Sequence, residues 1–189
     1  IPEAQRLIDS LESWGARVTI SGELTTGGDL SPGLASAAIS LFRTLMTDAT
    51  IDKSRVTFSI TSGNDQFHHG LKCVSPTDTT RRNGDPGRCY NSAHTQGNGL
   101  DFVIGGSVWD QRMVQNILRG YAAGSPNFRY LNEYAATGKK SAAATGDHFH
   151  LAWGETYKSH GDDNWGARKG SREEIMALVA ENKVTVRQV

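Results

Sequence analysis

Four side chains able to bind a metal ion stand in two short stretches of the sequence. His94 and Asp101 are seven residues apart in SAHTQGNGLD, and His148 and His150 flank a phenylalanine in GDHFH. The glycines of the first stretch let the backbone turn tightly between its two candidates. Residues two apart on a strand leave the same face, so His148 and His150 should point to one place. The alternatives without a metal are that His94 is a loop histidine hydrogen-bonded to the backbone, and that His148 and His150 belong to a polar stripe across the strands.

The chemistry that this set of side chains predicts is that of zinc. Two neutral imidazoles and one carboxylate form the shell of catalytic zinc sites, which keep a fourth position for water. Cysteine-rich structural zinc sites differ from this pattern, and the chain contains only two cysteines. We therefore expect one Zn²⁺ ion as the cofactor.

The elements that must position these residues follow from hydrophobic periodicity and capping signals. Helices are predicted over 2–14, 31–49, 108–124 and 171–183, the second with Ser31 as its N-cap. Strands are predicted over 16–22, 55–63, 99–106, 127–134 and 147–154. The expected fold class is α+β, a small and mostly antiparallel sheet flanked by helices. The whole chain, 1–189, is expected to be one domain with its core over about 30–153.

A polar loop interrupts this pattern as an insertion. It reads KCVSPTDTTRRNGDPGRC and holds Cys73 and Cys89. Proline, glycine, threonine and aspartate are typical of loops. The two cysteines are either reduced surface thiols or a disulfide worth ~3 kcal/mol, which would place the protein in an oxidising compartment.

Composition excludes several classes of partner. The 20 basic and 20 acidic side chains cancel, so no general affinity for nucleic acid or for an anionic membrane is expected. No apolar run approaches the ~20 residues that span a bilayer. The chain begins at Ile1 rather than methionine, and we expect it to be part of a larger polypeptide or of a phage particle.

At the first stretch the sequence resembles a known group of enzymes. Ser92, His94, Gly97, Gly99 and Asp101 look like the Ser-x-His-x-x-Gly-x-Ala-x-Asp signature of D-alanyl-D-alanine and L-alanyl-D-glutamate metallopeptidases, with glycine in place of the usual alanine. These enzymes share a zinc superfamily with lysostaphin-type peptidases and hedgehog domains. The resemblance covers about 30–153 and implies a fold of that type.

The second stretch continues the resemblance and implies roles for its residues. Asp147 matches the acidic residue three before a ligand, and His148 the first histidine of a His-x-His pair. The resemblance thus assigns His94, Asp101 and His150 as the metal ligands. Both Asp147 and His148 are candidates for the group that takes the proton of the attacking water, and we favour Asp147.

One departure from the family bears on the substrate. Members that recognise a free carboxylate continue Ser-Gly with an aromatic residue and an arginine, whereas this chain has Asp65 there. Asp65 would repel the free carboxylate of such a substrate, although an arginine of the cysteine loop such as Arg81 could bind that carboxylate in place of the family's arginine. His68, His69 and Trp153 are further candidates for substrate contacts.

The resemblance implies an enzyme of the bacterial cell wall. We expect a zinc metallopeptidase that hydrolyses stem peptides or cross-bridges of peptidoglycan and works outside the cell, at the wall or on a phage. The alternatives are a D,D-carboxypeptidase of the same family and a non-catalytic module that binds the cell wall.

Overall fold

A mixed sheet forms the centre of the fold. The computed structural model describes residues 1–65, 92–138 and 146–154, and within these ranges five strands follow the order β1-β2-β3-β5-β4. They are β1 Val18–Ile20, β2 Thr57–Ser62, β3 Gly99–Gly105, β4 Phe128–Asn132 and β5 Phe149–Trp153. Strands β1 and β2 run parallel and the other pairs antiparallel. The prediction of an α+β fold with a mostly antiparallel sheet is confirmed.

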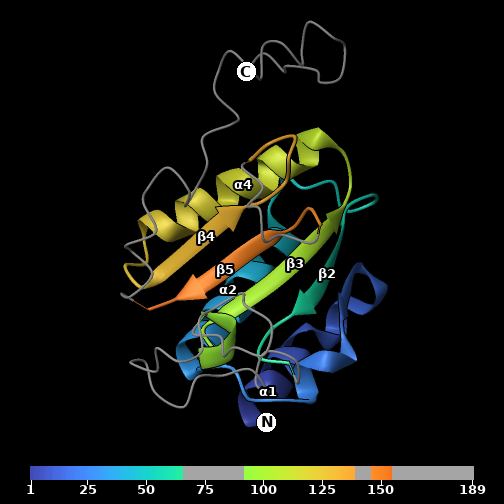
Figure 1. The fold of residues 1–189 in the computed structure, drawn as a ribbon. Coiled ribbons are helices and arrows are strands. Elements are labelled where there is room, and N and C mark those ends of the chain that lie inside the picture. Colours follow the sequence, from blue (N-terminus) through green and yellow to red (C-terminus); the bar gives the residue numbers. More distant parts are fainter. Residues whose placement is uncertain (66–91, 139–145, 155–189) are drawn as a thin grey trace, which may run out of the picture.

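Three α-helices accompany the sheet in the described residues. They are α1 Pro2–Leu11, α2 Pro32–Thr47 and α4 Val108–Ala123, and short 3-10 helices span Glu12–Arg17 (η1), Gly22–Thr25 (η2) and His94–Gln96 (η3). Figure 1 shows α2 passing behind the strands. The predicted N-cap of α2 is confirmed, since the backbone N–H of Leu34 donates to Ser31 Oγ at 3.2 Å. Helix α4 begins with a capping box between Ser107 and Asp110.

The core lies between the sheet and these helices. Phe42 of α2 packs edge-on against Phe58 of β2 and Phe102 of β3, and Phe102 stacks on Phe149 of β5 with ring centroids 5.3 Å apart. All four rings are fully buried. Because side chains alternate along a strand, the residues between these phenylalanines and their apolar neighbours face the other way. The sheet therefore has an apolar face toward the helices and a second face that is free to carry polar groups.

The ends of two predicted elements differ from the structure. Helix α1 ends at Leu11, earlier than expected, because η1 follows it and Gly15 takes a positive φ of 59°. Strand β5 begins at Phe149, so Asp147 and His148 precede it. Among the described residues, none of the helices has the length and apolar character that crossing a bilayer requires.

Several predictions concern residues outside the described ranges. They are the C-terminal helix over 171–183, the cysteine loop with Cys73 and Cys89, and the substrate candidates His68, His69 and Arg81. These stay predictions.

Candidate metal centre

Three predicted ligands meet on the polar face of the sheet. One ligand atom each from His94, Asp101 and His150 lies within 4.8 Å of the others. Asp101 Oδ1 is the common point, 3.2 Å from His94 Nε2 and 2.7 Å from His150 Nδ1. The two imidazole rings are tilted, with centroids 5.0 Å apart. The prediction that these distant residues form one group that could hold a metal ion is confirmed.

Strand register brings two of the ligands together. Asp101 of β3 and His150 of β5 are direct partners in the antiparallel ladder. The adjacent pairs, Leu100 with Leu151 and Phe102 with Phe149, are fully buried on the opposite face. Alternation therefore turns Asp101 and His150 away from the core, side by side. Their side chains are 18% and 14% exposed, so the site is sheltered from solvent although it lies outside the core.

A tight turn brings in the third ligand. His94 begins η3, which ends at Gly97 in the left-handed conformation (φ 74°) before the chain enters β3. The carbonyl of Gly97 accepts the backbone N–H of Ser31, which ties the turn to the start of α2. A Cβ at position 97 would lie 2.6 Å from the carbonyl oxygen of Asp29, so only glycine fits this turn.

Replacing Gly97 with alanine is expected to destabilise the protein and to weaken the binding of a metal ion, with zinc as the probe, at the His94–Asp101–His150 group. The left-handed conformation alone costs about 1–2 kcal/mol for an L-residue, and the contact with Asp29 adds to this. Thermal unfolding and a zinc titration measure the two effects. Gly120→Ala is the matched control, because Gly120 has open space around its Cβ position in α4 and the substitution should stabilise the helix by about 0.5–1 kcal/mol. Unchanged zinc affinity in Gly97→Ala would show that the turn does not position His94.

Backbone contacts orient the ring of His94 for metal binding. Its Nδ1–H donates to the carbonyl of Gly63, 3.0 Å away, at the end of β2. The hydrogen is thereby fixed on Nδ1, which leaves Nε2 as the ligand atom directed at Asp101. His150 presents Nδ1 instead. Metal-binding histidines typically have their second nitrogen held in this way.

The electrostatics of the group favour a cation. Burial by itself would raise the pKa of Asp101, but the charge of His94 and hydrogen bonds from His150 and His94 hold it well below its usual range. Burial by itself would lower the pKa of His94, yet the charge of Asp101 and the bonds to Asp101 and Gly63 raise it. Asp101 is thus an anion among imidazoles, and positive charge is stabilised at this point whether protons or a metal ion supply it.

His148 lies beside the three ligands. Its Nε2 is 3.7 Å from Asp101 Oδ2 and 2.6 Å from Glu133 Oε2, while its Nδ1–H donates to the Gly146 carbonyl at 2.9 Å. Both ring nitrogens therefore face oxygen acceptors. Burial would lower the pKa of His148, but the bond to Glu133 and the charge of Asp101 raise it to about 9. His148 Nε2 and His150 Nδ1 thus both lie near the Asp101 carboxylate, although His148 precedes β5.

Two other predicted site residues have different surroundings. Asp147 lies in the bend before β5, and its Oδ1 accepts the backbone N–H of Ala135 at 3.4 Å. The indole ring of Trp153 lies against Gly33 in the first turn of α2 and packs onto the core. The catalytic and substrate roles of both residues stay predictions.

The sequence alone assigned no catalytic role to two acidic residues that lie near the site. Glu133 is 6% exposed and pairs with His148. Asp65 is 5% exposed and accepts a hydrogen bond from Ser62 Oγ at 3.2 Å. The charge of Asp65 also contributes to the raised pKa of His94. A buried carboxylate needs a partner. Glu133 follows directly after β4, and that position was the only signal in the sequence that could have drawn attention to it.

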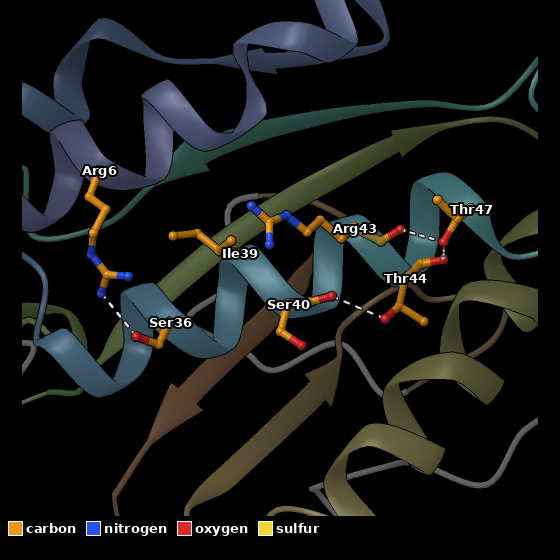
Figure 2. A pocket seen from close by; sticks show the side chains of 7 residues that line it. All are labelled: Arg6, Ser36, Ile39, Ser40, Arg43, Thr44 and Thr47. Atoms are coloured by element: carbon orange, nitrogen blue, oxygen red, sulfur yellow. Dashed lines mark hydrogen bonds between the residues drawn. The ribbon is translucent and has the colours of Figure 1, made fainter.

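A surface hollow lies elsewhere on the molecule. It has a volume of about 350 Å³ and runs along the outer side of α2, where Arg6 of α1 and Arg43 of α2 belong to its lining (Figure 2). Arg6 already donates to Ser36 Oγ at 2.9 Å, and the hydroxyl of Thr44 donates to a carbonyl of its own helix. None of the three metal-ligand candidates lines it.

Comparisons of the chain with protein-family models, with curated proteins and with solved structures gave no significant match. The geometry around Asp101 is therefore the main basis for a function.

Proposed function

We propose that the protein is a zinc metallopeptidase that hydrolyses peptide bonds of peptidoglycan. The observation that supports the proposal is the convergence of His94, Asp101 and His150 on one point, with Asp101 Oδ1 in contact with both rings. The likeness of the sequence to D-alanyl-D-alanine and L-alanyl-D-glutamate metallopeptidases supplies the substrate class.

The donor set fits zinc better than other abundant divalent ions. Mg²⁺ and Ca²⁺ prefer shells made of oxygen atoms, whereas imidazole nitrogens suit Zn²⁺ and its transition-metal neighbours. His94 Nε2, Asp101 Oδ1 and His150 Nδ1 would hold the ion, and His150 would then be a neutral ring with its hydrogen on Nε2. Zinc bound by these atoms would lower the pKa of a coordinated water to ~7 and polarise the carbonyl of the scissile bond.

Residues around the ligands would handle protons and charge. In this proposal Asp147 accepts the proton of the attacking water and returns it to the leaving amine. Both N–H groups of His148 already donate, to Gly146 and to Glu133. In this proposal the positive charge of His148 beside Asp101 therefore stabilises the oxyanion of the tetrahedral intermediate through space and not by a hydrogen bond. The Gly63 carbonyl keeps the ring of His94 in place throughout.

Asp65 favours an endopeptidase over a carboxypeptidase. It is buried and close enough to raise the pKa of His94. A second carboxylate near the ligands opposes a substrate with a free carboxylate next to the scissile bond. Peptide bonds within a stem peptide or a cross-bridge avoid this repulsion.

Digestion of purified muropeptides tests the proposal. The zinc-loaded protein should create new peptide termini, identified by mass spectrometry, and a chelator should abolish them until zinc is restored. The position of the new termini separates an endopeptidase from a D,D-carboxypeptidase, which would release terminal D-alanine. Binding of cell wall without any new terminus would instead identify a non-catalytic module.

A further inference from the structure

Glu133 contacts His148 at two points. Its carboxylate Oε2 lies 2.6 Å from His148 Nε2, and its backbone N–H donates to the His148 carbonyl at 3.0 Å. The side chain of Glu133 is 8% exposed and that of His148 is 15% exposed. A charge-assisted hydrogen bond in so sheltered a place is stronger than one at the surface.

The residues on either side of Glu133 are held in place. Asn132 Oδ1 accepts the backbone N–H of Tyr134 at 3.0 Å, so its side chain bridges the position that Glu133 occupies. Asn132 Nδ2 donates to Gln115 Oε1 at 2.8 Å and to Thr137 Oγ1 at 3.0 Å, and Asn132 itself is fully buried. The carboxylate of Glu133 thus projects from a rigid support, as a group that orients another side chain requires.

We infer that Glu133 is a positioning residue that fixes the ring of His148 beside the metal ligand Asp101. The inference rests on the proposed function for its catalytic consequence. The Gly146 carbonyl holds Nδ1, and the Glu133 carboxylate holds Nε2 at the opposite side of the ring. A contact to each of the two ring nitrogens fixes the orientation of the ring, whereas a contact to one nitrogen alone does not. Nε2 is thereby kept 3.7 Å from Oδ2 of the metal ligand Asp101.

Kinetics of Glu133→Ala, His148→Ala and the double variant test this coupling in the zinc-loaded protein. Glu133→Ala should lower kcat about 10–100-fold, the usual effect of losing a partner that orients a site residue, with KM little changed and one equivalent of zinc retained. In the His148→Ala background, loss of Glu133 should change kcat by less than about twofold. Glu133→Gln keeps an acceptor oxygen in the same shape and should recover part of the activity. Additive losses in the double variant would overturn the inference.

Nuclear magnetic resonance of the metal-free protein gives a reading that does not depend on activity. The wild type should show a His148 Nε2–H resonance protected from exchange with solvent, because Glu133 accepts that hydrogen. The resonance should disappear in Glu133→Ala and persist in Glu133→Gln. Its persistence in Glu133→Ala would show that Glu133 does not hold the ring. If the wild type failed to cut muropeptides, the proposed function would be wrong, but the resonance would still show whether Glu133 holds the ring of His148.

Discussion

Asp101→Ala is expected to lower the affinity for zinc by more than about 100-fold, beyond the effect of removing an outer partner of a ligand. Asp101 Oδ1 is the atom that both imidazoles contact, at 3.2 and 2.7 Å, and it brings the only negative charge of the three ligands. Without it, two neutral nitrogens remain, and neither balances the charge of the ion. Competition with a chromophoric chelator measures the affinity, and hydrolysis of muropeptides should be lost in parallel.

Two variants serve as controls for this result. Asp101→Asn keeps the shape of the side chain but removes its charge, so it separates packing from ligation. Asp9→Ala removes an exposed carboxylate of α1 that bonds Gln5, and it should leave zinc binding unchanged. If Asp101→Ala bound zinc as tightly as the wild type, the ion would have to lie elsewhere in the chain.

Asp147→Ala is expected to reduce turnover by about 10²–10⁴-fold, the usual contribution of a general base, while one equivalent of zinc stays bound. The reason is that Asp147 directly precedes His148 and lies three residues before His150, in the bend before β5, and is not needed to hold the ion. Steady-state hydrolysis of a defined muropeptide and metal analysis of the same sample measure the two quantities.

Turnover of Asp147→Ala is to be compared with turnover of His148→Ala. Loss of the His148 charge should lower kcat by about 10–100-fold, below the ~10²–10³-fold effect of removing a direct oxyanion donor. Should Asp147→Ala remain active and His148→Ala be inactive, the roles of the two residues would be reversed.

Much of the fold could be predicted because its signals are local. Ser31 and Pro32 mark the start of α2, and the alternation of Val56, Phe58 and Ile60 marks β2. Asp101 stood out because it lies seven residues after His94, with glycines between them that let the backbone turn. The types and spacing of these side chains thus indicated the candidates, and the resemblance to the metallopeptidases selected His94, Asp101 and His150 among them.

The details that were missed depend on contacts between distant parts of the chain. Glu133 reads as an ordinary acidic residue after a strand, and only the pairing of β4 with β5 brings it to His148. The hydrogen bond of His94 to Gly63 likewise follows from the meeting of β2 and η3, which are 31 residues apart at this contact. Helix α1 was predicted too long because the pattern of apolar residues continues through η1, where the backbone leaves the α-helical path.

The pairing of Asp101 with His150 also bears on how the sheet finds its correct alignment. If β5 slipped by one residue along β3, its side chains would exchange faces, and His150 would turn into the phenylalanine-lined core. An ion bound by both residues would stabilise the native alignment and none of its neighbours. A bound metal ion would therefore favour the correct pairing of β3 with β5, and the metal site and the strand register would form together.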